Sequence, residues 1–371
     1  MQYKDVIEIN GQKLTKKYIA SLNREQREAW IIPMFEYFRS LGWLLPDFDP
    51  DTLKNSYKKL IEYAPYTSIN EAYNNSSLAN DICMYFCRKS FYSVTERKGG
   101  KIRPTLIDNF LDDNKLKKMC RNRLGLEWYD EEGQRGEVFN ITPKMLMYQA
   151  QRSMRLIPQI TIFKPGIAKL IYLKYTKEND LVYDFSAGFG SRVLGALSCN
   201  RRYIGVDPLT IPEIREMLKF LNVPSDRYEL INGVSENYVG LENSVDFAFS
   251  SPPYYDQEFY SNDSTQAYNH GEDYFYNTYW RNTLKNIKFM LRQDKLFALN
   301  LSKKYPKMFE IAKEYFGDPI EIFSLRTVRS HLNKTGKSDA QKYEPIYIFK
   351  NSTKLLSNLP NTPNLIFELD I

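Results

Sequence analysis

Two short segments of the 371-residue chain carry residue types suited to chemistry. The first runs from Leu181 to Pro208, where Gly188 and Gly190 follow a short apolar run that ends at Asp184. Glycines let a backbone turn tightly and approach a ligand without a Cβ in the way. Asp207 follows about 20 residues later, where a carboxylate can accept hydrogen bonds from both vicinal hydroxyls of a ribose. The segment therefore suits a cofactor that carries a nucleoside.

This segment does not complete a dinucleotide fingerprint. The pattern G-x-G-x-x-G needs a third glycine, and Val193 stands in its place, which counts against NAD or FAD. A glycine turn between a strand and a helix also occurs without any ligand, so an ordinary connection stays open as the plainer interpretation. A second segment downstream favours the functional one.

The second segment is Ser251-Pro252-Pro253-Tyr254, directly after the apolar run from Asp246 to Ser250. Two consecutive prolines lack amide hydrogens and fix φ, so the chain enters a rigid extended loop where a strand ends. In open α/β sheets, ligands bind at this carboxyl edge. The two segments are therefore expected to face a common ligand site.

With these segments in this order, the chain resembles the S-adenosylmethionine-dependent amino-methyltransferases of DNA, whose catalytic motif is Asp/Asn/Ser-Pro-Pro-Tyr/Phe/Trp. The resemblance extends over residues 162 to 350. It implies an α/β fold with a Rossmann-like class I methyltransferase sheet, mostly parallel with an antiparallel last strand. It also implies S-adenosylmethionine as cofactor and no metal, with the catalytic residues Ser251, Pro252, Pro253 and Tyr254.

The resemblance further implies where the cofactor binds. The expected contacts from the glycine turn are Asp184, Ser186, Gly188, Gly190 and Asp207. Phe163-Lys164-Pro165 resembles the family segment that covers the methionine part, so that Phe163 would cover the sulfonium and Lys164 would meet the carboxylate. A helix start with proline in its first turn explains this segment equally well.

Asn232 departs from the family pattern. It stands where the family commonly has an acidic residue that reads the adenine amino group. The amide oxygen of Asn can still accept that hydrogen bond, without the added strength that a charged acceptor gives. Asn232 is therefore kept as an expected cofactor contact.

The chemistry implied is methyl transfer to an exocyclic amine, whose lone pair is delocalised into the base and must be aligned with the sulfonium methyl. The Ser251 hydroxyl is expected to accept one amine hydrogen, the Pro252 carbonyl the other, and Tyr254 to stack on the base. A duplex hides the amine, so the base must be flipped out or single-stranded. Methylation of a ring carbon instead needs a Cys beside the proline, and the chain has no Pro-Cys pair.

Several targets and functions stay open. Ser at the first motif position leans towards cytosine N4, but adenine N6 remains an equal candidate because hydroxyl and carboxamide fill the same acceptor role. The expected partner is DNA, with RNA or a modified base as the alternative substrate. A catalytically silent nucleic-acid binder, or a transferase with an altered cofactor, is a third possibility. Whether a restriction or other defence partner exists is not determined by the sequence.

The elements that position these residues are expected to form two domains. Residues 151–371 alternate apolar runs with helical periodicity, as a catalytic α/β domain requires. Asp256 to Asp273 is polar and rich in turn residues, which predicts a lid. The connection from Arg326 to Lys342 carries several basic residues that would straddle phosphates or lie on the surface.

Residues 1–150 predict a mainly helical domain with a possible role in recognising the target. Helices are expected from Asn23, over Asp51 to Tyr63 and over Asn75 to Phe91. Basic residues recur between Arg88 and Arg123, interrupted by acidic ones. They indicate either a solvated face or a phosphate-binding patch.

Composition bounds the remaining possibilities. Hydrophobic residues make up 43% and aromatic residues 15% of the chain, which excludes a disordered protein. The formal charge of +6 is compatible with a polyanionic partner. The cysteines form no Cys-x-x-Cys pair, and the sequence has no apolar run of membrane-spanning length, so a cytoplasmic protein with reduced thiols is expected.

Overall fold

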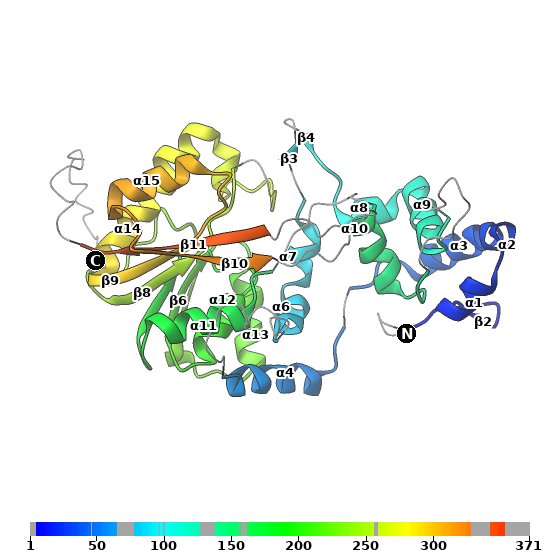
Figure 1. Cartoon of the computed structure of the whole chain (residues 1–371), viewed down its shortest axis with the longest axis horizontal. Helices are drawn as coiled ribbons and strands as arrows, with labels where there is room; N and C mark the ends of the chain where they lie inside the picture. Colours follow the sequence, from blue (N-terminus) through cyan, green and yellow to red (C-terminus); the bar gives the residue numbers. More distant parts are fainter. Residues whose placement is uncertain are drawn as a thin grey trace, which may run out of the picture.

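The computed structural model describes residues 5–45, 47–64, 78–95, 97–98, 101–126, 138–154, 156, 162–255, 259–327 and 342–352. Figure 1 shows a twisted sheet with helices on both of its faces, beside a group of helices formed by the first part of the chain. Most of the basic connection expected from Arg326 to Lys342 lies outside the described residues, as does the start of the expected lid at 256–258.

Seven strands form the central sheet, in the order β10-β11-β9-β8-β5-β6-β7. β5 to β9 pair in parallel, whereas β11 runs antiparallel to both of its neighbours. The expected Rossmann-like fold, mostly parallel with an antiparallel last strand, is confirmed. Strand order reverses beside β5, which is where open α/β sheets bind ligands. The strands are β5 (Leu181–Asp184), β6 (Arg202–Asp207), β7 (Tyr228–Asn232), β8 (Val245–Ser250), β9 (Leu291–Asn300), β10 (Glu321–Thr327) and β11 (Lys342–Lys350).

Successive side chains of the central strands point to opposite faces of the sheet. On β8, Phe247 and Phe249 enter one apolar core and Ala248 enters the other. β9 alternates in the same way, with Ala298 on the first face and Phe297 on the second. Because both faces are buried, the strands read as nearly continuous apolar runs in the sequence.

Helices cover both faces of the sheet (Figure 1). The first core is closed by α11 (Pro165–Tyr175), α12 (Ser191–Leu197) and α13 (Ile211–Phe220). The second core is closed by η4 (Tyr274–Trp280), α14 (Arg281–Met290) and α15 (Pro306–Phe316). This arrangement leaves the carboxyl ends of β5, β6 and β8 free to form a site.

The first part of the chain builds a third apolar core of its own, with Met34, Phe38, Phe110 and Leu146 fully or almost fully buried. Asn23 and Gln26 form a capping box at the start of α2, where a helix is expected. The helices of this group are α1 (Lys16–Ser21), α2 (Arg24–Ala29), α3 (Ile31–Leu41), α8 (Leu106–Leu111), α9 (Asp113–Arg123), η1 (Met145–Ala150) and α10 (Gln151–Ser153).

The apolar cores do not divide at residue 150, as the sequence predicts. The helices α4 (Pro50–Glu62), α6 (Asn80–Phe86) and α7 (Arg88–Ser93) belong to the first core of the sheet, together with α11, α12 and α13. The ammonium of Lys169 on α11 donates to the Leu60 and Ile61 carbonyls of α4, at 2.8 Å each. Figure 1 shows α4 beneath the sheet unit. The helices α4, α6 and α7 are thus part of the catalytic fold.

A hairpin from the first part of the chain contacts the segment that follows Ser-Pro-Pro-Tyr. The hairpin consists of β3 (Arg97–Lys98) and β4 (Lys101–Ile102), and Thr95 at its base exchanges backbone hydrogen bonds with Phe259 at 2.9 and 2.8 Å. The Arg97 guanidinium lies over the Phe259 and Tyr268 rings, 5.1 and 5.9 Å from their centroids. The start of the expected lid is therefore tied to the hairpin.

Short elements complete the description: β1 (Glu8–Ile9), β2 (Gln12–Lys13), the 3₁₀ turn η2 (Ser225–Arg227) and the 3₁₀ turn η3 (Ala267–His270). No helix within the described ranges combines the length and the apolar character that crossing a membrane requires. All four cysteines are free and buried.

Gly195 sets the distance between α11 and α12. A Cβ at this position would meet the Ala168 Cβ at 2.7 Å and the Lys169 amide nitrogen at 2.8 Å. Gly195→Ala should therefore lower the free energy of unfolding by about 1–3 kcal/mol, as overpacking does, although alanine favours a helix. Denaturant unfolding measures this. Gly233→Ala is the control, because its Cβ would have its nearest neighbour at 3.8 Å, and equal losses in both variants would contradict the packing argument.

Candidate active site

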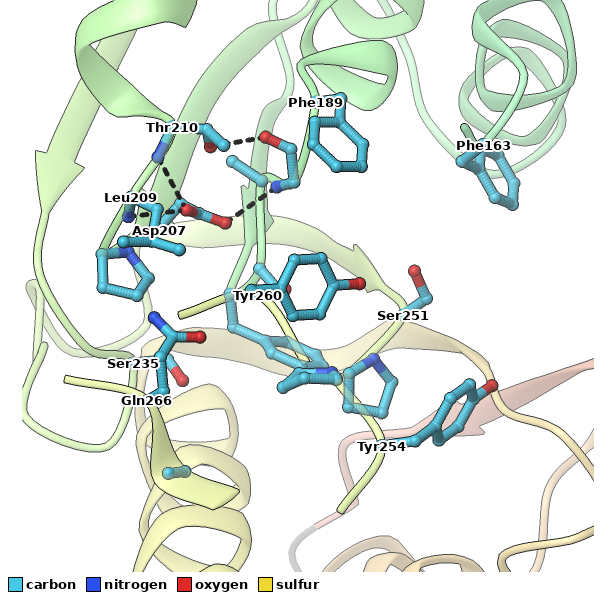
Figure 2. A pocket seen from close by; sticks show the side chains of 18 of the residues that line it. Phe163, Phe189, Asp207, Leu209, Thr210, Ser235, Ser251, Tyr254, Tyr260 and Gln266 are labelled. Carbon is cyan, nitrogen blue, oxygen red and sulfur yellow. Dashed lines mark hydrogen bonds between the residues drawn. The ribbon is translucent and has the colours of Figure 1, made fainter. Parts of the chain in front are cut away.

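A cavity of about 710 Å³ opens at the carboxyl ends of β5, β6 and β8. It brings together eight of the twelve residues that the sequence predicts for the site: Phe163, Ser186, Gly188, Asp207, Ser251, Pro252, Pro253 and Tyr254. Figure 2 shows Asp207 on one side of this space and Ser251 and Tyr254 on the other, with Tyr260 between them. The glycine turn and the Ser-Pro-Pro-Tyr loop therefore share one site.

Asp207 organises the side of the cavity formed by β6. Its carboxylate accepts hydrogen bonds from the amides of Gly188 at 3.0 Å, Leu209 at 2.9 Å and Thr210 at 3.0 Å. The Thr210 hydroxyl in turn donates to the Gly188 carbonyl, and Figure 2 draws these bonds. Burial raises the pKa of Asp207, and the amide donors oppose that rise. The carboxylate thus joins the glycine turn to the next loop and still faces the cavity.

The two glycines of the turn do different things. Both have positive φ, 56° at Gly188 and 79° at Gly190, which a side chain would strain. Gly188 lines the cavity, and a Cβ there would have no atom closer than 3.8 Å. Gly190 does not line it, because a Cβ at this position would meet Met217 at 2.7 Å on the helix α13. The expectation that Gly190 contacts a cofactor is corrected to a packing role.

Tyr254 is held from one side by another aromatic ring. Tyr305 stacks on it with ring centroids 4.2 Å apart and planes 6° apart. The Tyr254 hydroxyl accepts the Ser302 amide at 3.0 Å. A base that stacks on Tyr254 would meet a ring that is already oriented by these contacts.

Asp184 lies beneath the cavity and does not line it. It has no exposed surface, and its carboxylate accepts from the Ser250 hydroxyl at 2.6 Å and the Tyr203 hydroxyl at 2.7 Å. It also pairs with the Arg192 guanidinium at 2.7 Å. The expected cofactor contact of Asp184 is therefore corrected, because these groups use its oxygens to hold the two loops in place.

Arg192 is the residue that the sequence analysis missed. It begins the second position of α12, and its guanidinium reaches the Ser251 hydroxyl at 3.0 Å and the Ser186 carbonyl. Burial alone would lower the pKa of Arg192, but the Asp184 carboxylate outweighs it and the pKa is raised. An arginine in the first turn of a helix gives no local signal of function, so only the folded geometry reveals the link.

Phe163 and Lys164 separate in the structure. Phe163 lines the cavity, 5.7 Å from the Arg192 guanidinium and 5.5 Å from the Phe249 ring. Lys164 is the N-cap residue of α11 and does not line the cavity, and burial lowers its pKa. The proposed contact of Lys164 with a carboxylate is corrected to the helix start that the sequence offers as the plainer interpretation.

Asn232 is exposed and does not line the cavity. It pairs with Asp207 across β6 and β7, so its side chain points away from the site that Asp207 faces. The cavity is lined instead by Ser235 and Glu236, three and four residues later, both buried. Burial raises the pKa of Glu236, and the Tyr274 hydroxyl donates to its carboxylate at 3.2 Å.

Gln266 comes from the segment after Ser-Pro-Pro-Tyr and lines the same end of the cavity as Ser235. Its side chain is 6% exposed, and its amide nitrogen has no hydrogen-bond partner among the described residues. A buried donor without a partner costs free energy, so this group is suited to a ligand with an acceptor. The predicted lid thus supplies a polar residue to the site.

Lysines stand at the edge of the cavity. Lys303 and Lys304 follow β9, and Lys89 lies on α7, and all three are exposed and line the cavity. Lys89 belongs to the basic segment that the sequence analysis could interpret in two ways. No group of three or more His, Cys, Asp or Glu side chains that could hold a metal ion occurs in the described part of the chain.

Comparisons with known proteins add little. No protein-family model matches the sequence, and no curated protein matches it. Among solved structures, the tRNA (m1A58) methyltransferase TrmI of Aquifex aeolicus aligns with a TM-score of 0.37 at 15% identity, over 53% of this chain and 72% of that one. A SAM-dependent O-methyltransferase of Thermotoga maritima aligns with a TM-score of 0.35 at 13% identity, over 60% and 76%.

A precorrin-6y C5,15-methyltransferase of Geobacter metallireducens aligns with a TM-score of 0.36 at 16% identity, over 53% of this chain and 92% of that one. At TM-scores below 0.5, none of these likenesses carries an argument about this chain. Its fold and site rest on its own strand order and side chains.

The role of Asp207 in holding the loops can be tested without any ligand. Asp207→Ala leaves three amide donors without their acceptor, which should lower the free energy of unfolding by about 1–3 kcal/mol. Hydrogen exchange should accelerate at the amides of Gly188, Leu209 and Thr210. Asp226→Ala, at an exposed position on η2, should change neither quantity. Unchanged exchange at the three amides of Asp207→Ala would show that the carboxylate does not hold them.

Proposed function

We propose that the protein transfers a methyl group from S-adenosylmethionine to the exocyclic amino group of a nucleic-acid base. The preferred substrate is DNA, at cytosine N4 or adenine N6. The observation that carries the proposal is the single cavity that joins Gly188 and Asp207 with Ser251 to Tyr254. A nucleoside-bearing donor and an amino base need those two halves within one enclosed space.

The residues on one side of the cavity fit the cofactor. Gly188 leaves room for close backbone approach, and Asp207 presents an acidic edge suited to ribose hydroxyls. The unpaired Gln266 amide and the buried Glu236 carboxylate offer a donor and an acceptor to an adenine ring. Phe163 would lie along the methionine part. When bound, S-adenosylmethionine supplies an electrophilic methyl group.

The residues on the other side suit an amino base. The Pro252 carbonyl accepts an amine N–H, Ser251 contacts the same edge of the base, and Tyr254 stacks on its face. The amine nitrogen attacks with its lone pair as the S–C bond of the cofactor breaks, and the methylated amine then loses one proton to water. No covalent intermediate with the protein is required. The target base must leave its stack to enter the cavity.

The charge around the cavity supports a nucleic acid as the substrate. Lys89, Lys303 and Lys304 surround the opening, and the chain carries a formal charge of +6. Lysines at such positions hold the phosphates beside a flipped base and carry no sequence information. An RNA base presents the same amino edge, so structured RNA is the second substrate to be tested.

The test is methyl transfer from labelled S-adenosylmethionine to unmodified duplex DNA and to structured RNA, with nucleoside mass spectrometry to identify the product. Tyr254→Ala should lose about 10²-fold or more in turnover, because the base is no longer held in line with the methyl group. Its affinity for S-adenosylhomocysteine, measured by calorimetry, should remain that of the wild type. Asp207→Ala and Asp207→Asn should bind S-adenosylhomocysteine about 10- to 100-fold more weakly.

Equal losses of affinity and turnover in the Tyr254 and Asp207 variants would contradict these separate roles. If the wild type does not bind S-adenosylhomocysteine at millimolar concentration, the methyltransferase proposal fails. The alternative of a silent nucleic-acid binder then gains support from any binding to DNA or RNA that remains.

The lysines allow a second prediction. Lys303→Ala and Lys304→Ala should each weaken DNA binding and reduce the slope of log K against log salt by about 0.9, the change expected for one lost phosphate contact. Lys219→Ala is the control, because Lys219 is exposed on α13 and does not line the cavity. Salt slopes that do not differ between the three variants would exclude the phosphate contacts.

A further inference from the structure

Arg192 connects the cofactor half of the cavity to the catalytic loop through one guanidinium. Its Nε donates to Asp184 at 2.7 Å, one terminal nitrogen donates to the Ser251 hydroxyl at 3.0 Å and the other to the Ser186 carbonyl. The side chain is 4% exposed. Three neighbours on three different segments thus fix the orientation of the group, and one of them is the first residue of Ser-Pro-Pro-Tyr.

The contact with Ser251 has a direction. A guanidinium can only donate, so the Ser251 oxygen must be the acceptor in this bond. Among the described residues, Arg192 is the hydrogen-bond partner of that hydroxyl. One lone pair of the oxygen is therefore used, and the hydroxyl proton remains available to the cavity. A positive donor behind the oxygen also strengthens the hydroxyl as a donor, because chains of hydrogen bonds polarise one another.

We propose that Arg192 is a positioning residue that makes Ser251 a hydrogen-bond donor to the ring nitrogen next to the target amine. The inference rests on the proposed function and refines it. It reverses the sequence-based expectation that Ser251 accepts an amine hydrogen. The Pro252 carbonyl accepts an amine N–H, while the Ser251 hydroxyl donates to the neighbouring nitrogen. The two groups then match the acceptor and donor positions along one edge of the base.

This polarity defines which bases the site takes. Cytosine N3 and adenine N1 are both unprotonated acceptors beside the exocyclic amine, so each satisfies the Ser251 hydroxyl. Guanine presents the N1–H donor beside its amine and would face the hydroxyl with a second donor. A site built to donate to a substrate atom rejects analogues that lack the acceptor, since its own polar group is then left unpaired. The amine must therefore stand next to an unprotonated ring nitrogen.

The test uses a duplex that contains the site identified by nucleoside analysis, with the target base replaced by 3-deazacytosine or 1-deazaadenine. These analogues keep the amine and replace the ring nitrogen by C–H. The wild type should methylate the analogue about 10- to 100-fold more slowly than the normal base. Ser251→Ala should be slow on both and should not distinguish them. Ser264→Ala, at an exposed position that does not line the cavity, should discriminate like the wild type.

Arg192 is tested through a double-mutant cycle. Arg192→Lys keeps the charge beside Asp184 but loses the fixed fork of donors. It should slow turnover in the wild-type background and should have no further effect in the Ser251→Ala background. Affinity for S-adenosylhomocysteine should be unchanged in both variants. Because Ser251→Ala leaves the Asp184–Arg192 pair intact, the analogue comparison remains informative even if Arg192→Lys does not fold.

Three results would overturn the inference. Additive losses in the double variant would mean that Arg192 does not act through Ser251. Weaker binding of S-adenosylhomocysteine by Arg192→Lys would assign the guanidinium to the cofactor carboxylate instead. Equal rates of the wild type on the normal base and its deaza analogue would show that Ser251 does not donate to the ring nitrogen. A wild type that methylates neither DNA nor RNA would defeat the proposed function itself.

Discussion

The site depends on a buried ion pair between Asp184 at the tip of β5 and Arg192 on α12. Both side chains are almost fully removed from water, where an isolated charge would cost several kcal/mol. The pair is tolerated because the remaining capacity of each partner is used, by Ser250 and Tyr203 on the carboxylate and by Ser186 and Ser251 on the guanidinium. The ends of β5 and β8 are thereby held at a set separation.

The sheet delivers these groups to one place because of its register. β5 lies between β6 and β8, so the residues that leave the carboxyl ends of three parallel strands converge. Two apolar cores, one on each face, keep the strands from sliding, since a shift of one residue would exchange the buried faces. The precision of the cavity is therefore a property of the sheet, and its loops need only short connections.

The sequence allowed the fold and the centre of the site to be predicted where the signal is local. A glycine turn after an apolar run, an acidic residue at the next strand tip and a double proline each constrain their own neighbourhood, and their residues line the cavity. Lys164, Gly190 and Asn232 were misplaced because side-chain direction depends on helix and strand register. Arg192, Glu236 and Gln266 could not be found, since distant segments bring them to the cavity.

The helices α4, α6 and α7 carry a consequence for how the chain can be divided. Ile82, Cys83 and Phe91 fill the same core as Val193 and Met217, although more than 100 residues separate them in the sequence. A fragment that starts at residue 151 would expose the apolar side of α11 to α13 to water and would be prone to aggregate. Neither gene fusion nor proteolysis at that point would release an autonomous catalytic module, so the two parts of the chain must be inherited together.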